Sequence, residues 1–307
     1  MYDLIIIGSG VSGMGAAIYA GRFDLKTLVI GELPGGTITL THLVENYPGF
    51  PSLSGLELAQ NFQRHVDSIG VTIEQEKISK ITFNSEKKFF ELKTQNEKNY
   101  QTKSILLTTG TKHRKLGIKG EAEFTNKGVS YCATCDGPFF RDKDVIMVGG
   151  ADSAVKESLL LAKYAQKVTI VYRGEKVRPE PINQKRMEET PNIEVITKSN
   201  LVEIMGQSQV EKVLLDTGQE LKCQGVFIEI GRTPLTDLAK QLNVTLNEKS
   251  EVIINKASET NVPGFFAAGD CTNTDWKQAI IGVAEGCMGA YSAYQYVESL
   301  GGKLKKP

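Results

Sequence analysis

The stretch Leu4-Ile5-Ile6-Ile7-Gly8-Ser9-Gly10-Val11-Ser12-Gly13 decides the fold of this chain. Its first residues form a short apolar run, which is typical of a strand buried in a parallel sheet. A strand followed by GxGxxG and a helix, here expected over residues 12–21, is the pattern of a pyrophosphate-binding turn. In that pattern Gly8 makes the tight turn, Gly10 lets a phosphate approach the backbone, and Gly13 lets the helix pack closely on the strand. The partial positive charge at the helix N-terminus favours the same ligand.

The pattern continues outward from this turn. Residues 27–30 form the next predicted strand, and Glu32 just beyond it is the nearest carboxylate able to hold a ribose. Apolar residues at helical spacing predict a helix over 55–69. Alternating stretches near 71–83 and 88–93 indicate antiparallel strands, and residues 104–108 a further strand.

The same alternation restarts near residue 115. Residues 144–148 predict a strand, 149–154 a glycine turn, and the following segment a helix that Asp152 or Ser153 can cap and that runs to about Ala165. A strand over 168–172 and a meander over about 193–230 complete this part, and the chain returns to the first domain near 246, with a closing helix over about 277–299. We therefore expect an α/β protein of two Rossmann-like dinucleotide-binding domains, the second inserted into the first. The predicted domains are 1–114 with 246–307, and 115–245, with crossings near 113–118 and 243–248.

The second glycine turn is the weaker of the two. Gly149, Ala151 and Ala154 fit GxGxxA only if Ala151 stands where glycine is usual, and its methyl group crowds the face that should meet a pyrophosphate. Arg173 and Arg178, downstream of the next strand, are spaced to reach a ribose 2′-phosphate, as in NADPH. The alternative is that both are solvated surface arginines.

Cys132-Ala133-Thr134-Cys135-Asp136 lies between the two glycine turns. A CxxC pair can close and reopen a disulfide, one thiol in such a pair usually has a lowered pKa, and the adjacent carboxylate of Asp136 can donate or accept a proton. The rivals are a structural zinc site, which needs two more ligands, and a passive disulfide. No metal site is expected, because Cys223, Cys271 and Cys287 are isolated and His42, His65 and His113 show no ligand spacing. Cys223 and Cys287 are expected to be inert, and the histidines to be surface or satisfied core residues.

The composition narrows the class of protein. The 307 residues suffice for two domains, and 36 basic residues balance 36 acidic ones, so no long-range field favours nucleic acid. No apolar run approaches the length of a membrane span. The N-terminus opens on a strand without a basic leader, and five cysteines are an odd, low count, so a cytoplasmic, reducing location is expected.

These motifs together resemble the low-molecular-weight thioredoxin reductases, and the resemblance runs essentially from end to end. Tyr131-Cys-Ala-Thr-Cys-Asp136-Gly matches the active-site motif of that family, Glu45-Asn-Tyr-Pro-Gly49 a flavin-side segment, and Phe266-Ala-Ala-Gly269-Asp270 with Lys277-Gln278-Ala279 its second FAD signature. The resemblance implies FAD in the first domain and NADPH, or NADH, in the inserted one. The implied FAD-binding residues are Gly8, Gly10, Gly13, Glu32, Gly36, Thr37, Asn46, Gly269, Asp270, Lys277, Gln278 and Ala279. The implied NADP-binding residues are Gly149, Ala151, Ser153, Ala154, Arg173 and Arg178.

The resemblance also implies a mechanism. Electrons would pass from the nicotinamide through FAD to the Cys132–Cys135 disulfide and on to a thioredoxin-like protein. Cys135 would face the flavin, Cys132 would attack the acceptor, and Asp136 would act as general acid and base. The inserted domain would swing about the two crossings, and the protein would be a homodimer.

Four departures from the family pattern keep alternatives open. Ala151 replaces a glycine, Tyr172-Arg173-Gly174 replaces His-Arg-Arg, Thr37 replaces a glutamine and Lys277 an arginine. The first two fall in one site and weaken the case for NADPH, since a lost charge-assisted contact costs about 1.5–3 kcal/mol, or about tenfold to a hundredfold in affinity. The alternatives are a flavin-dependent reductase fed by ferredoxin or another donor, and a flavin-binding redox sensor.

Overall fold

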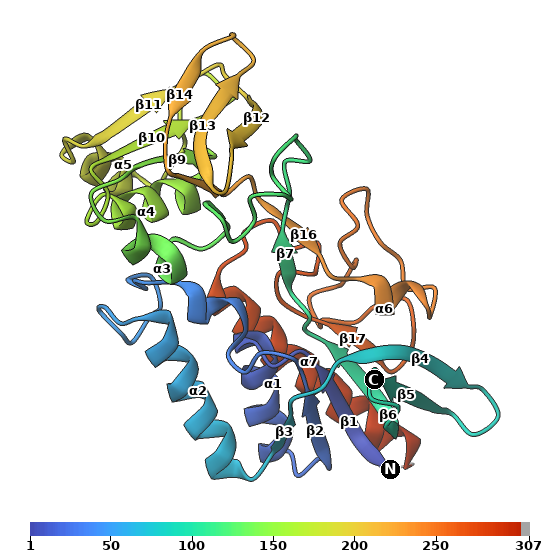
Figure 1. The fold of residues 1–307 in the computed structure, drawn as a ribbon. Coiled ribbons are helices and arrows are strands. Elements are labelled where there is room, and N and C mark those ends of the chain that lie inside the picture. Colours follow the sequence, from blue (N-terminus) through green and yellow to red (C-terminus); the bar gives the residue numbers. More distant parts are fainter. Residues whose placement is uncertain (302–307) are drawn as a thin grey trace. The chain divides into compact units, whose positions relative to one another are not determined.

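The structure is a computed structural model that describes residues 1–301. The chain divides into an outer unit, Met1–Lys112 with the residues from Thr233 onward, and an inserted unit, His113–Arg232. The main sheet of each unit contains parallel strands accompanied by helices, so the α/β class is confirmed (Figure 1).

The outer unit is built on a seven-stranded sheet with the order β3-β2-β1-β6-β5-β4, in which β17 also pairs with β6. The strands β1, β2, β3, β6 and β17 are parallel, whereas β5 and β4 continue the sheet in the antiparallel sense. The antiparallel stretches predicted near 71–83 and 88–93 therefore correspond to β4 and β5, while β3 joins the parallel part. The strand bounds are β1 Tyr2–Ile7, β2 Thr27–Ile30, β3 Thr72–Glu74, β4 Ile78–Asn84, β5 Phe89–Thr94, β6 Asn99–Leu107 and β17 Phe265–Ala267.

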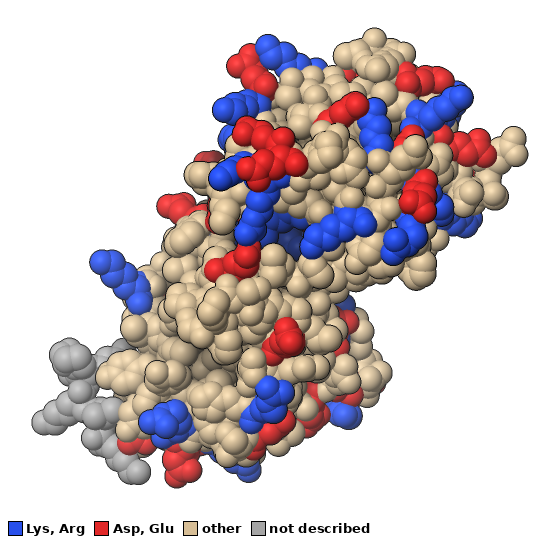
Figure 2. All heavy atoms as spheres, turned by 90° about the vertical axis from the view of Figure 1, so that its left-hand side faces the viewer, with Lys and Arg blue, Asp and Glu red and all other residues tan. Residues whose placement is uncertain are grey.

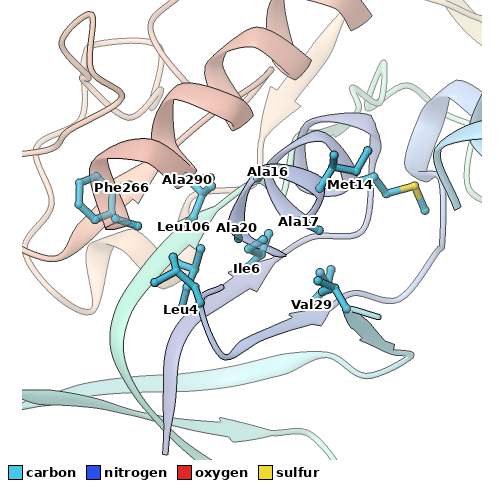
Figure 3. Close-up of a cluster of buried hydrophobic side chains, with 14 of the residues drawn as sticks. Leu4, Ile6, Met14, Ala16, Ala17, Ala20, Val29, Leu106, Phe266 and Ala290 are labelled. Carbon is cyan, nitrogen blue, oxygen red and sulfur yellow. The ribbon is translucent and has the colours of Figure 1, made fainter. Parts of the chain in front are cut away.

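The outer unit also contains three long helices, α1 (Val11–Arg22), α2 (Gly55–Ile69) and α7 (Ala279–Leu300). Side chains from β1, α1 and β6 pack together, and Leu4, Ile6, Met14 and Leu106 are at most 1% exposed (Figure 3). Each such side chain stabilises the fold by about 1.5–3 kcal/mol when fully buried. This core fixes the strand-to-helix junction at residues 8–13, which is where the first glycine turn lies.

The inserted unit contains a five-stranded parallel sheet with the order β11-β10-β9-β15-β8 and a three-stranded antiparallel meander, β12-β13-β14. The predicted meander over 193–230 is thus only partly a meander, because its first and last strands join the parallel sheet. The strand bounds are β8 Val129–Ser130, β9 Asp144–Val148, β10 Lys167–Val171, β11 Ile193–Ile196, β12 Leu201–Gly206, β13 Val210–Leu215, β14 Glu220–Lys222 and β15 Gly225–Ile228.

Helix α4 of the inserted unit covers Asp152–Leu161 and is shorter than predicted. Its N-cap is Ala151, with no side-chain cap, so neither Asp152 nor Ser153 serves as the cap. The carboxylate of Asp152 instead accepts hydrogen bonds from the Glu180 backbone N–H and from Asn183 Nδ2, both at 2.8 Å. These bonds tie the start of α4 to α5 (Pro181–Glu188).

The chain crosses between the units through β7 (Thr111–His113) and β16 (Arg232–Pro234), which pair with each other. The second crossing therefore lies upstream of the stretch 243–248 in which the sequence places it. The reason is that Ala239, in α6 (Asp237–Lys240), and Val244 belong to the core of the outer unit, together with strand residues such as Ile5 and Leu107.

No helix among residues 1–301 is both long and apolar enough to cross a lipid bilayer. Figure 2 shows acidic and basic side chains intermingled over the face that it draws.

Candidate active site

Cys132 and Cys135 form a disulfide, and their Cα atoms lie 5.4 Å apart. Cys135 lies on the single-turn helix α3 (Ala133–Asp136), and Cys132 is the residue that precedes it. The Cys135 backbone N–H donates to Cys132 Sγ at 3.1 Å. A backbone donor aimed at a sulfur atom stabilises negative charge on that atom, so the geometry favours Cys132 as the nucleophile of the reduced pair.

The redox pair lies beyond the carboxyl end of β8, an edge strand of the parallel sheet. This edge is where α/β proteins usually place their functional residues. The Ser130 hydroxyl accepts from the Cys132 N–H at 3.0 Å, and the Tyr131 hydroxyl donates to Glu121 Oε1 at 2.7 Å. Asp136 ends α3, and its N–H donates to the Cys132 carbonyl at 3.1 Å. The segment is followed by η2 (Gly137–Phe140), whose Phe140 is buried.

The remaining cysteines, Cys223, Cys271 and Cys287, are free thiols. Burial raises the pKa of Cys223 to about 12, and of Cys271 and Cys287 to about 11. Thiols of this kind are scarcely ionised near neutral pH and are poor nucleophiles. No group of three or more His, Cys, Asp or Glu side chains within residues 1–301 is arranged to hold a metal ion.

The first glycine turn has the geometry that a pyrophosphate requires. Gly8 has a φ of +117°, and a Cβ on Gly13 would collide with the Gly8 carbonyl oxygen. A Cβ on Gly10, by contrast, would meet no described protein atom closer than 3.8 Å. Packing within the protein therefore explains the glycines at 8 and 13, but not the one at 10, where a Cβ would make only ordinary van der Waals contact with Gly35 and Gly36. The Ser9 hydroxyl lies beside Gly31 and is buried without a hydrogen-bond partner among the described residues.

The stretch around Gly36 and Thr37 lies against this turn. Both residues belong to η1 (Gly36–Leu40), the Gly35 N–H donates to the Ser9 carbonyl at 2.8 Å, and a Cβ on Gly36 would meet Gly10. Glu32 lies beyond β2 with 62% of its side chain exposed, 3.1 Å from Lys77 Nζ. Its carboxylate is therefore shared with a lysine.

The second flavin-type motif borders a shallow, open depression in the same unit. Its lining includes Gly269, Asp270, Trp276, Lys277 and Gln278. Asn46 Nδ2 donates to Gln278 Oε1 at 3.0 Å and so brings two distant motifs together, while Ala279 begins α7. Lys277 Nζ is held at 2.6 Å by the Thr272 carbonyl and at 3.0 Å by Glu251, so its ammonium group is bound to its own loop.

The second glycine turn is partly covered by its own unit. A Cβ on Gly150 or on Gly174 would collide with the aromatic ring of Tyr172. The Arg178 N–H donates to the Gly150 carbonyl at 2.7 Å, which folds the segment after β10 back onto the turn. Ala151, Ser153, Arg173 and Arg178 are exposed, whereas Ala154 is buried and only 3.0 Å from where a Gly149 Cβ would lie.

Sequence reasoning missed a group of charged side chains behind the CxxC pair. Glu157, Glu229 and His113 come from three separate segments of the inserted unit, and Glu157 accepts a hydrogen bond from Ala133 N–H at 3.4 Å. His113, which the sequence predicts to be a surface or satisfied core residue, has Nδ1 3.0 Å from Glu229 Oε1, while its Nε2 is buried without a hydrogen-bond partner among the described residues. The one available signal was a carboxylate, Glu229, directly after the apolar run Val226-Phe-Ile228.

Comparison with known proteins agrees with this geometry. A model of the pyridine nucleotide-disulphide oxidoreductase family matches residues 2–286. The chain is similar to a thioredoxin reductase of Listeria innocua, with 38% identity over 98% of this chain and 95% of that protein. It is also similar to a crystal structure of Lactococcus lactis thioredoxin reductase in the FR conformation, with 36% identity, a TM-score of 0.93, and coverage of 97% of this chain and 100% of that one. A ferredoxin-flavin thioredoxin reductase from Clostridium acetobutylicum matches with 33% identity, a TM-score of 0.53, and coverage of 98% and 99%.

Proposed function

Because the chain belongs to the pyridine nucleotide-disulphide oxidoreductase family, we propose that it is a thioredoxin reductase of the low-molecular-weight type, which passes electrons through FAD and the Cys132–Cys135 pair to a thioredoxin-like protein. The observation that carries this proposal is the disulfide on α3, within a unit inserted into a dinucleotide-binding unit. A passive structural disulfide would not need Asp136 beside it, nor a backbone donor aimed at Cys132 Sγ.

The chain's own residues supply the thiol chemistry. In the reduced pair, the Cys132 thiolate attacks one sulfur of the acceptor disulfide and forms a mixed disulfide, while the other acceptor sulfur leaves and takes a proton from Asp136. Cys135 then attacks Cys132, and its thiol proton passes by way of the Asp136 carboxylate to the second acceptor sulfur, which leaves as a thiol as the internal disulfide reforms. Two electrons leave the pair in each cycle.

The outer unit fits FAD at two places. The Gly10 backbone, which no side chain crowds, suits the pyrophosphate, and the open depression beside Asp270 and Gln278 suits the flavin end. Gly36, Thr37 and Asn46 border these places, and Glu32 and Lys277 complete the set that we assign to FAD. When bound, FAD supplies an electron pair that can reduce the disulfide.

For the electron donor, the first candidate is NADPH, held by Gly149, Ala151, Ser153, Ala154, Arg173 and Arg178. The exposed start of α4 and the two exposed arginines support it. The Ala151 methyl group and the Tyr172 ring against Gly150 weigh against tight binding, and NADH is the alternative nucleotide.

The second candidate donor is a reduced ferredoxin or a similar one-electron carrier. The observation that favours it is the same Tyr172 ring, which fills space beside the glycine turn where the family pattern has His-Arg-Arg. The Clostridium acetobutylicum neighbour is described as a ferredoxin-flavin thioredoxin reductase.

Anaerobic stopped-flow mixing tests both donors. The FAD-loaded protein is mixed with NADPH, with NADH or with reduced ferredoxin, in the presence and absence of oxidised thioredoxin. Rapid flavin bleaching by a nicotinamide removes the ferredoxin candidate. Flavin reduction by any donor without turnover of a protein disulfide contradicts the reductase and leaves a redox sensor. A homodimer stays a prediction, which multi-angle light scattering checks.

A further inference from the structure

A group of charged side chains lies behind the CxxC pair, entirely within the inserted unit. Glu157, on α4, accepts a hydrogen bond at 3.4 Å from the N–H of Ala133, the residue between Cys132 and Thr134. Glu229 directly follows β15, its side chain is only 3% exposed, and its Oε1 lies 3.0 Å from His113 Nδ1. This arrangement, the carboxylate cluster, therefore joins the redox helix to the crossing strand β7.

The carboxylate cluster is poorly satisfied by hydrogen bonds. His113 Nδ1 and Nε2 and Glu229 Oε1 are buried without a partner of good geometry among the described residues, although Nδ1 and Oε1 are close. Buried polar groups are normally paired, because an unpaired one costs about 1–3 kcal/mol. A cluster retained at such a cost, directly behind the redox pair, calls for a role beyond packing.

The charges around Glu157 favour its protonated form. Burial in the first place, and the charge of Glu229 in the second, raise the pKa of Glu157 to about 8, while the Ala133 hydrogen bond and Arg232 on β16 oppose them. Two further titratable groups lie nearby, His113 beside Glu229 and Asp136 at the end of α3. A carboxylate of this kind changes its charge within the working pH range of an enzyme.

We propose that Glu157, supported by Glu229 and His113, is a positioning residue that binds a proton when the Cys132–Cys135 disulfide is reduced, and so links the redox equilibrium of the pair to pH. The inference deepens the proposed function and rests on it. Reduction places a negative thiolate at α3, close to Glu157, and a new negative charge favours the protonated form of a neighbouring carboxylate. By linkage, a proton on Glu157 favours the thiolate in return.

At a pH where Glu157 is ionised in the disulfide form, reduction of the pair takes up two electrons and two protons. Two electrons from a dithiol reductant break the S–S bond, one sulfur takes a proton and the other stays a thiolate. The second proton goes to the Glu157 carboxylate. At lower pH, Glu157 already carries its proton in both forms and adds nothing. As the pH rises through the pKa of the disulfide form, the disulfide form gains stability, and the wild-type equilibrium constant for reduction falls relative to that of a variant without the carboxylate.

The test measures exchange of the full-length protein with dithiothreitol from about pH 6.5 to about 9.5, with thiols trapped by alkylation and counted by mass spectrometry. The readout is the equilibrium constant of Glu157→Gln divided by that of the wild type, in which the titration of dithiothreitol cancels. We expect this ratio to be flat below about pH 7 and to rise about tenfold by about pH 9. A ratio that stays flat over the whole range overturns the inference.

Two further variants make the test specific. Glu229→Gln removes one of the two causes that raise the Glu157 pKa, so the equilibrium constant for reduction of this variant should begin to fall at a lower pH than that of the wild type. If the fall begins at the same pH, Glu229 does not contribute to the proton binding by Glu157. Glu203→Gln is the matched control, because Glu203 pairs at 2.7 Å with the exposed Lys119 of the same unit, and its ratio to the wild type should stay flat. Exchange with dithiothreitol needs neither nucleotide nor thioredoxin. A flat Glu157→Gln ratio therefore leaves the reductase proposal standing, whereas failure of the pair to exchange at all counts against that proposal.

Discussion

The ring of Tyr172 lies directly against Gly150, on the turn that precedes α4. The same ring also fills the space that a side chain at Gly174 would need. The Tyr172 ring occupies the space beside both glycines, so an arginine at position 174 would collide with it. The His-Arg-Arg pattern therefore cannot be restored by changing Gly174 alone.

The double variant Tyr172→His, Gly174→Arg should therefore bind NADPH more tightly than the wild type. The new guanidinium adds a charge-assisted contact to the 2′-phosphate, which is worth about 1.5–3 kcal/mol, so we expect a gain of about tenfold to a hundredfold in affinity. Isothermal titration with NADPH measures it. Tyr172→His alone, which adds no arginine, is the control, and an equal gain in both proteins would assign the effect to the ring.

Gly10 and Gly13 give a matched pair of alanine variants in one turn. Gly10→Ala meets no protein atom within 3.8 Å, so the apoprotein should melt close to the wild type, but its methyl group should weaken FAD binding at least about tenfold. Gly13→Ala collides with the Gly8 carbonyl oxygen and should lower the free energy of unfolding by about 1–3 kcal/mol. Thermal denaturation and quenching of flavin fluorescence check both. Undiminished FAD affinity in Gly10→Ala would refute the assignment of the pyrophosphate to this turn.

Cys132→Ser and Cys135→Ser should each lower thioredoxin turnover by at least about a thousandfold, because a lone thiol cannot return to a disulfide within the pair. Flavin binding should be unchanged, since the FAD-type motifs lie in the outer unit. Cys223→Ala, in the core of the inserted unit, is the control and should keep its turnover. Activity retained in both serine variants would move the chemistry elsewhere.

Alkylation by iodoacetamide near pH 8 should separate the reduced pair from the other thiols. The pKa values of about 11 for Cys271 and Cys287 leave roughly a thousandth of each thiol ionised at that pH, and Cys223, at about 12, still less. Raising the pH increases the thiolate fraction of all three, so their alkylation should speed up about tenfold per pH unit as long as the fold persists. Mass spectrometry after short exposure reads the order of modification, and early labelling of Cys271 would contradict its burial.

The sequence predicted correctly those helices and strands that a single local pattern, such as an apolar run, marks. The apolar run at residues 4–7 became β1, and the closing helix expected over 277–299 is α7, Ala279–Leu300. The CxxC disulfide was predictable for the same reason, since its two partners are only three residues apart. The second domain boundary was not, because the sequence shows no change of composition near 232, and only the core shows that Ala239 and Val244 pack with the outer unit.

The contacts that complete the site depend on distant segments. Asn46 and Gln278 lie 232 positions apart and meet through one hydrogen bond, and nothing in either segment predicts the pairing. The carboxylate cluster draws its members from β7, α4 and the end of β15, and in sequence each looks like an ordinary charged or polar residue. Burial and proximity, which create their chemistry, are properties of the folded chain.

The two crossing strands have a consequence for how such a protein can be rebuilt. The Arg114 N–H donates to the Gly231 carbonyl at 3.0 Å, so the entrance and exit of the inserted unit are hydrogen-bonded neighbours. A segment whose ends already meet can be removed and its gap closed by a tight turn with little loop-closure cost, and without re-registering the sheet that it interrupts. Recombination can therefore exchange residues 113–232 as one segment for another redox domain. The outer unit would keep its own strand pairing, because the ends of the exchanged segment lie side by side.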